Sequence, residues 1–469
     1  MAAPWTGGLQ SLKARLPAAL QPYQWGFVGY LIIADLVPTL YSLTNTYWIG
    51  HLSNSALAIT EQYEFPSVMI EIVNQTIPFG VLALVAQNFR DKEKITTVLK
   101  SAVVIQLLFS TALMVGMLSF MPQFVTTIGT PDSIVSQTRG YLVIQAIALP
   151  FNSVATLLLV SIKSMRRGRT VLYLVFSSVV LNMAMDLFLV SNTPLSIHLG
   201  IDGSAVGYVV SQAFLFTVAA GYAVKTFGVS LGSLSLSKWS GMVRPLFSIG
   251  GWTGLDSLVR NIGYIMVPLN VLNVIGTNQY GGYELAMTVM WTVIIPMLAI
   301  VEGTQVTVGN YYGERDIVKL KQVLLTSLLL VGLVMAGVAV GGVFFWNSLS
   351  AFFNQNPAMV QFSDATFWWM IVPYVLYGLG EAIQSVLVGT GKTRYVMYNS
   401  AICNFGMVIP FWILAKLGYV VASFDNVMAL FVVVFALDFG IAVFFVRRVL
   451  NQISANPTDS RRVGVNGSP

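Results

Sequence analysis

The sequence is poor in charged residues, in cysteine and in histidine. Charged side chains make up 9% of its 469 residues, and it has one cysteine and two histidines. The single cysteine, Cys403, excludes a disulfide within the chain. Two histidines, His51 and His198, are too few for a histidine-rich metal site, although carboxylate ligation of an ion stays open. The first residues lack the pattern of a cleavable signal peptide, so we expect none.

What the chain has instead is apolar surface. Hydrophobic residues make up 56% of it, and its mean hydropathy is +0.74. Apolar runs of about 20 residues, the length that crosses a bilayer as an α-helix, recur along the chain. We therefore predict an all-α membrane protein with twelve transmembrane helices. The predicted spans lie near 25–49, 65–88, 97–121, 140–162, 171–191, 203–224, 248–275, 284–308, 322–345, 366–389, 395–415 and 427–446.

Basic residues are distributed unevenly over the predicted loops. If the N-terminus is cytoplasmic, all of the 25 Lys and Arg residues except Arg139, Arg260 and Lys416 fall on the cytoplasmic side. Because cytoplasmic loops are enriched in Lys and Arg, this predicts a multi-pass protein of the plasma (inner) membrane with both termini in the cytoplasm. The net charge of +6 is then a consequence of topology, and we expect no nucleic acid partner.

Two segments about half a chain apart resemble each other. Residues 150–170 read PFNSVATLLLVSIKSMRRGRT and residues 373–393 read PYVLYGLGEAIQSVLVGTGKT, and each ends in a Gly-(Arg/Lys)-Thr turn. Chance similarity of apolar helices is the alternative to a duplication. A duplication predicts two pseudo-symmetric six-helix lobes around a central cleft, an N-lobe over 1–232 and a C-lobe over 233–469.

Eight acidic residues lie inside or at the edges of the predicted helices. A charged side chain in the bilayer centre costs about 2.5–3.5 kcal/mol on insertion scales, so such residues predict a polar pathway lined by protonatable or cation-binding groups. Two of them have another expected place: Glu64 at the mouth, and Asp438 against a cytoplasmic basic loop. The eight are Asp35, Glu64, Glu71, Asp186, Asp256, Glu302, Glu381 and Asp438.

Six short segments resemble those of one family, the MATE multidrug and toxin extrusion transporters. In chain order they are NTYWIGHLSNSALA (45–58), ALPFN (148–152), LNMAMD (181–186), GIDGSAVG (200–207), VGNYYGERD (308–316) and EAIQSVLVGTGKT (381–393). The resemblance implies twelve helices in two lobes. It also implies export of organic cations by antiport with H⁺ or Na⁺, with no cofactor besides the coupling ion.

The fifth predicted helix carries an amide and an acid on one face. Asn182 and Asp186 are four residues apart, and an amide oxygen beside a carboxylate can ligate Na⁺ or share a proton. The resemblance assigns this pair, joined by Asn152, to the cation site of the N-lobe. A structural polar pair between helices is the alternative.

The first predicted helix departs from the family pattern. Asn45 stands where the family usually has Asp, and on the sixth helix Tyr208 stands in place of the hydroxyl that the family often has there. Asp35 lies ten residues earlier, near the middle of the membrane, and we expect it to compensate as an ion-coupling residue from a different height. Pro38 would kink the helix just after it. A hydrogen-bonded packing role for Asp35 is the alternative.

The C-lobe supplies three further acids. Asp256 and Arg260 are four residues apart, so we expect the Arg to pair with an acid. Asp256 and Glu381 resemble acids of NorM-like members, whereas Glu302 is not usual in the family. We predict that all three couple to H⁺ or Na⁺, because three acids against one Arg leave an excess of carboxylate charge if all ionise.

The predicted ligand is a cationic, amphipathic small molecule. Aromatic rings attract such cations, although aromatic residues are more often part of a core. We expect membrane lipid as the other partner and a monomer as the assembly. The predicted substrate-binding residues are Tyr41, Asn45, Glu71, Arg260, Tyr264, Trp291, Tyr377 and Gln384.

Two other classes of function were compared with an exporter. A flippase for a lipid-linked or glycolipid substrate would need a cationic cleft for phosphates, whereas the predicted cleft is acidic. A membrane enzyme is not expected, because both histidines lie in outer loops and the Gly-Lys-Thr of 391–393 lacks the upstream glycine of a phosphate-binding loop.

Overall fold

The computed structural model describes residues 20–455, apart from 51, 53, 54, 128, 129, 192, 229–235 and 355. Over these ranges the chain is a succession of long helices, and no strand occurs in them. The predicted all-α class is therefore confirmed. The described residues divide into two compact units: Gly29–Gly254, called the N-unit below, and the residues before Gly29 together with those from Leu255 on, called the C-unit.

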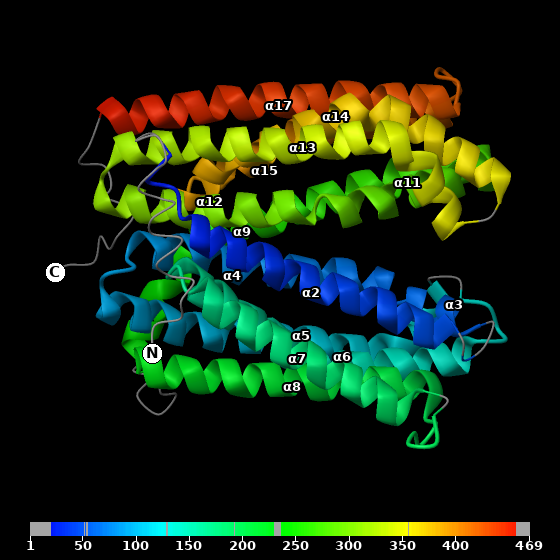
Figure 1. The fold of residues 1–469 in the computed structure, drawn as a ribbon, viewed down its shortest axis with the longest axis horizontal. Helices are drawn as coiled ribbons and strands as arrows, with labels where there is room; N and C mark the ends of the chain where they lie inside the picture. The colour runs from blue at the N-terminus through cyan, green and yellow to red at the C-terminus, as the bar shows by residue number, and fades with distance from the viewer. Residues whose placement is uncertain are drawn as a thin grey trace. The chain divides into compact units, whose positions relative to one another are not determined.

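The N-unit is built around α6. This helix packs against α4, α5 and α8, and α7 packs against α8 (Figure 1). Pro150 lies inside α6. Proline is tolerated in membrane helices where neighbouring groups satisfy the freed backbone carbonyl. The helices are α2 (Trp25–Gly50), α3 (Ala56–Glu61), α4 (Glu64–Gln87), α5 (Lys92–Thr127), α6 (Val135–Ser164), α7 (Gly168–Leu189), α8 (Gly200–Phe227) and the first part of α9 (Leu236–Tyr264).

The C-unit is built around α14 in the same way. This helix packs against α12, α13 and α17, and also against α11. After the end of α9, the elements are η2 (Ile265–Leu272), α10 (Asn273–Ile275), α11 (Thr277–Val293), α12 (Ile295–Glu314), α13 (Ile317–Phe353), α14 (Pro357–Gly389), α15 (Arg394–Cys403), η3 (Asn404–Val408), α16 (Ile409–Lys416) and α17 (Phe424–Ala455). Both η2 and η3 are π-helical.

The two similar segments occupy corresponding places in the two units. Each lies on the central helix, α6 or α14, and runs into a turn with one residue of positive φ, Arg166 (59°) or Gly391 (72°). In both turns the next backbone N–H donates five residues back, from Arg167 to Ile162 and from Lys392 to Leu387. The unit boundaries fall within α2 and α9, so lobes divided at residue 232 stay a prediction.

Ten of the described helices are long and apolar enough to cross a membrane, or up to eleven if the bent pair α11 and α12 forms one span. A multi-pass membrane protein is thus confirmed, whereas the predicted count of twelve is not. The predicted span 248–275 is absent from the set of candidate helices. Its residues are divided among α9, which carries Asp256 and Arg260, the π-helix η2, where Pro268 removes a backbone donor, and the short α10.

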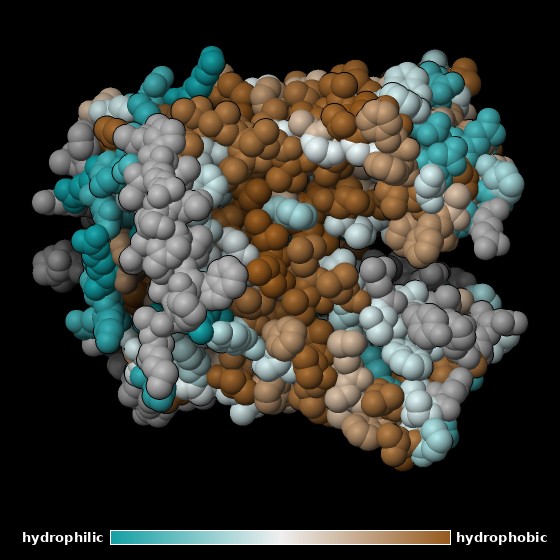
Figure 2. Space-filling view, in the orientation of Figure 1, coloured by the Kyte–Doolittle hydropathy of each residue, from teal (hydrophilic) through white to brown (hydrophobic). Residues whose placement is uncertain are grey.

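The long helices expose hydrophobic side chains along their middles (Figure 2). On α5, Leu108 is 58% exposed, and on α13 Leu333 is 71% exposed. Contiguous apolar surface of this kind is unusual on a protein surrounded by water and is suited to contact with lipid.

Candidate functional site

The N-unit holds a buried acid on α7. Asp186 is 1% exposed, and the Tyr41 hydroxyl of α2 donates to its Oδ2 at 2.8 Å. Asn182, one helical turn earlier, is 5% exposed. The Oδ1 atoms of Asn182 and of Asp186 are buried and have no hydrogen-bond partner among the described residues. Two oxygens on one helix face are therefore available to a cation or a donor.

Gly207 of α8 lies directly against this acid and amide. A Cβ at Gly207 would lie 3.1 Å from Met185 Cβ, 3.4 Å from Asn182 Oδ1 and 3.6 Å from Asp186 Oδ1. The absence of a side chain thus lets α8 approach the two oxygens closely. Gly207 is the last residue of the segment GIDGSAVG and was not among the predicted site residues.

A second set of amides and hydroxyls lies in the same unit. Asn152 of α6 donates to the Tyr208 hydroxyl at 2.8 Å and accepts from Thr156 at 3.1 Å. Gln145 donates to the Tyr141 hydroxyl at 3.0 Å. The partners that the structure gives to Asn152 are therefore Tyr208 and Thr156, and Asp186 is not among them.

The two remaining N-unit predictions concern α2. Asp35 forms an ion pair with Lys163 of α6, with 3.6 Å between Oδ1 and Nζ. It lies six residues before Tyr41, about 9 Å along the helix axis, so it is not part of the Asp186 cluster. Asn45 accepts a hydrogen bond from Ser204 at 3.3 Å. The structure thus gives both residues other partners than Asp186.

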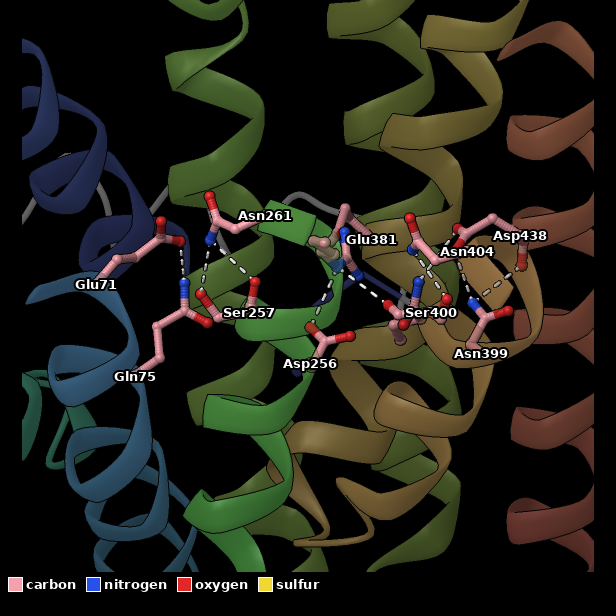
Figure 3. Close-up of polar contacts among 12 residues, drawn as sticks. Glu71, Gln75, Asp256, Ser257, Asn261, Glu381, Asn399, Ser400, Asn404 and Asp438 are labelled. Atoms are coloured by element: carbon pink, nitrogen blue, oxygen red, sulfur yellow. Dashed lines mark hydrogen bonds and ion pairs between the residues drawn. The ribbon is translucent and has the colours of Figure 1, made fainter. Parts of the chain in front are cut away.

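The C-unit holds two acids on one guanidinium. Arg260 of α9 pairs with Asp256 (Nε to Oδ2, 3.1 Å) and with Glu381 of α14 (Nη1 to Oε1, 3.4 Å). It also donates to Ser400 Oγ of α15 at 3.1 Å (Figure 3). The expected pairing of Arg260 with an acid is confirmed, and Glu381 is a second partner that spacing along one helix does not reveal.

Asp438 belongs to the same unit's interior, and the expectation that it pairs with a cytoplasmic basic loop was wrong. Asn399 Nδ2 donates to Asp438 Oδ1 at 2.9 Å (Figure 3). Gln384 Nε2 lies 3.5 Å from Asp438 Oδ2. The physical reason is helix length: α17 continues to Ala455, beyond the predicted end at 446, so Asp438 lies well inside it.

The other predicted acids and the histidines have different surroundings. Glu302 is half-buried on α12 and is not among the ion-pair partners of Arg260. Glu71 is exposed and accepts a hydrogen bond from Gln75 of its own helix. The side chain of Glu64 and all of His51 lie outside the described residues. His198 has positive φ (54°) in the turn before α8.

Two of the predicted aromatic residues contact each other. Trp291 and Tyr377 meet edge to face with their ring centres 6.0 Å apart, and Tyr377 also meets Phe435 at 5.8 Å. The Tyr264 hydroxyl donates to Glu284 at 2.7 Å. A cluster of three or more His, Cys, Asp or Glu able to hold a metal does not occur in the part of the chain that the structure describes.

Comparison with known proteins identifies the family. A family model described as MatE matches residues 31–188 and 253–414, which is more than half of the chain. A multi-pass helical membrane protein with this match is a membrane transporter, as predicted. The chain belongs to the MATE family.

Individual relatives agree with this assignment. The chain is 21% identical to the "Probable multidrug resistance protein YoeA" of Bacillus subtilis, over 82% of this chain and 84% of that protein. It is 20% identical to the "Probable multidrug resistance protein NorM" of Photorhabdus laumondii, over 86% of this chain and 91% of the relative. A solved outward-facing multidrug resistance MATE transporter has a TM-score of 0.81 and 16% identity, over 91% and 95% of the two chains, which shows the shared fold.

Proposed function

We propose that the protein exports cationic, amphipathic small molecules by antiport with H⁺ or Na⁺. The observation that carries the proposal is Asp186, a buried acid whose hydrogen-bond donor is the neutral Tyr41 hydroxyl. No ion pair of Asp186 occurs among the described residues. An acid of this kind, beside an Asn182 oxygen that is also without a partner, can take up and release a cation.

Coupling follows from charge. Uptake of H⁺ or Na⁺ at Asp186 removes a negative charge from the buried face of α7. A cationic substrate is then bound less strongly, because it loses the attraction of the ionised Asp186 carboxylate. That attraction is far larger in a low-dielectric interior than in water. In an alternating-access cycle, the ion that enters from outside thus favours release of the substrate.

The finer architecture is part of the proposal. We propose twelve spanning segments in two pseudo-symmetric lobes, an even number that places both termini on the cytoplasmic side. The membrane would be the plasma (inner) membrane, and the protein would act as a monomer. The corresponding packing of α6 and α14 supports the duplication. The predicted ion-coupling roles of Asp35, Asn152 and Glu302 remain predictions, as do the substrate contacts of Glu71, Tyr264 and Trp291.

Ethidium efflux from proteoliposomes tests the proposal. A pH gradient and a Na⁺ gradient are imposed separately at equal ionic strength, with protein-free liposomes as the control. Efflux driven by one gradient establishes antiport and names the coupling ion. Folded protein that gives no efflux under either gradient contradicts cation export, and the flippase hypothesis, which the names of the relatives do not favour, would then be tested with a lipid-linked substrate.

A further inference from the structure

Three arginines of the C-unit have no acidic partner. Arg394 is the first residue of α15, Arg447 and Arg448 lie near the end of α17, and all three are exposed. No ion pair of these arginines occurs among the described residues. Lys319 of the same unit, by contrast, pairs with Asp316 at 2.7 Å. The charge of the three arginines is therefore not compensated within the described part of the unit.

The three arginines lie at the same end of two neighbouring helices. Asn399 of α15 donates to Asp438 of α17 at 2.9 Å (Figure 3). Tyr395, one turn earlier on α15, has its ring centre 5.0 Å from that of Phe445, which comes later on α17. The two helices therefore run antiparallel, and Arg394 at the start of α15 lies beside the part of α17 that follows Phe445.

A tyrosine holds the Arg394 guanidinium in place. The Arg394 Cζ atom is 4.9 Å from the centre of the Tyr395 ring, and Nη2 donates to the Tyr395 hydroxyl at 3.2 Å. Tyr395 itself is buried against Phe445. Because a guanidinium has five N–H donors, one bond to a hydroxyl leaves most of them available to a further ligand.

The exposed face of α17 carries a groove that changes from apolar to basic along the helix. It has a volume of about 690 Å³ and runs from Gly440 past Phe444 to Arg447, Arg448 and Gln452. Gly440 leaves open space, since a Cβ there would meet nothing within 4 Å, and Phe444 is 59% exposed. The apolar part is suited to an acyl chain. The basic part is suited to a phosphate, which arginine can bind through two N–H groups at once.

The position of the two arginines along α17 matches the level of lipid phosphates. Residues 427–446 rise by about 30 Å along the helix axis, the thickness of the hydrocarbon core. Asp438 is the only charged residue in this stretch, and Arg447 and Arg448 follow it directly. A free phosphate would leave the apolar part of the groove empty, whereas a lipid fills both parts.

We propose that Arg394, Arg447 and Arg448 bind the head group of an anionic phospholipid, with one acyl chain in the apolar part of the α17 groove. Basic pockets at the cytoplasmic ends of transmembrane helices bind anionic head groups in this way. Asn451 and Gln452, exposed beside the arginines, offer hydrogen bonds to head-group hydroxyls. The inference rests on the proposed topology only in assigning the lipid to the cytoplasmic leaflet.

Thermal unfolding of the full chain in detergent tests the site without requiring transport. Dioleoylphosphatidylglycerol is titrated into the micelles. Dioleoylphosphatidylcholine supplies the same chains with a zwitterionic head group, and glycerol phosphate at equal ionic strength supplies the anionic group without chains. A ligand of the folded state raises the melting temperature by mass action, so each titration yields an apparent affinity. We expect only phosphatidylglycerol to stabilise the protein over the range tested.

The variants should rank by the positive charge removed. Arg447→Gln together with Arg448→Gln should weaken the apparent affinity for phosphatidylglycerol about tenfold or more, and Arg394→Gln about fivefold. The matched control is Lys319→Gln together with Lys321→Gln, which removes two exposed charges from α13 of the same unit and should leave the affinity unchanged. Arg394→Gln keeps the test decisive if the double arginine variant does not fold.

Three outcomes would overturn the site. Equal stabilisation by the two lipids would exclude recognition of the charge, and equal stabilisation by glycerol phosphate would indicate a site for free phosphate. An equal loss of affinity in the lysine control would show a general attraction to basic surface. Ethidium efflux separates this inference from the proposed function: selective stabilisation by phosphatidylglycerol in a wild type without efflux leaves the lipid site standing and contradicts the exporter.

Discussion

Each unit contains acids of two kinds, and the comparison separates them by their partners. In the N-unit, Asp35 pairs with Lys163, whereas Asp186 receives the neutral hydroxyl of Tyr41. In the C-unit, Asp256 and Glu381 share Arg260, whereas Asp438 receives neutral amides. An acid with a resident Lys or Arg already has its counter-charge. An acid whose hydrogen-bond donors are neutral has no Lys or Arg in direct contact with its carboxylate.

The two acids with neutral hydrogen-bond donors are not copies of each other. Asp186 lies on α7 and Asp438 on α17. The register that places Pro150 opposite Pro373 would place Asp186 opposite Ile409, at the start of α16. Similar packing around α6 and α14 therefore does not place acids at equivalent positions, and the partners of each acid differ between the two units.

The largest expected effect is that of Asp186→Asn. Removing the carboxylate charge while keeping the shape should abolish gradient-driven ethidium efflux, because no cation exchange then occurs on α7. Initial rates in proteoliposomes, with Asp132→Asn as the matched control in an exposed loop, measure it. Wild-type rates in a folded Asp186→Asn protein would contradict the assignment of coupling to this acid.

Arg260→Met should give the next largest effect, a loss of folding stability. It leaves Asp256 and Glu381 without their shared cation. Breaking a fully buried pair costs about 3–5 kcal/mol, and we expect about 1–3 kcal/mol here because the Arg260 side chain is 36% exposed. Thermal melting in detergent measures the loss. Adding Glu381→Gln should restore part of it, and a double variant no more stable than Arg260→Met would contradict the shared ion pair.

Tyr41→Phe tests whether the neutral hydrogen-bond donor of Asp186 affects ion coupling. It removes one hydrogen bond to a buried carboxylate, worth about 1.5–3 kcal/mol for a charged acceptor, and leaves the acid in place. We expect efflux to persist and its dependence on the coupling-ion concentration to shift by about tenfold or more. Efflux measured across an ion titration checks this, with Tyr173→Phe, an exposed tyrosine of α7, as the control. An unchanged titration would show that the hydroxyl does not tune the acid.

The smallest effect is expected at Asp316, which lies outside the candidate spans and caps α13. Hydrogen bonds from the Lys319 side chain and backbone hold the pKa of Asp316 below its ordinary value. Its stabilisation is therefore present above the unfolded-state pKa and is lost as the pH falls through the lower folded-state pKa. Asp316→Asn keeps the cap and should cost about 0.3–1 kcal/mol at pH 7. Melting temperatures that still differ in strong acid would contradict this account.

The fold class could be predicted because membrane helices are a local property. Apolar runs and the distribution of Lys and Arg are readable along the chain, and the helix positions followed from them. The segment at 248–275 was less predictable, because its charged residues and the π-helix at Pro268 depend on what packs around them. The predicted end of the last helix was too early for a related reason, because α17 continues past its apolar stretch into polar residues that still favour a helix.

The sequence by itself determined the all-α membrane class, the MATE resemblance and the pairs at helical spacing, Asn182 with Asp186 and Asp256 with Arg260, because such pairs depend only on the period of one helix. Tertiary structure alone decided which acids have a resident cation. Lys163 is distant from Asp35 in the chain, and Glu381 from Arg260, and the amides that meet Asp438 come from two other helices. Contacts between helices depend on packing that no local pattern encodes.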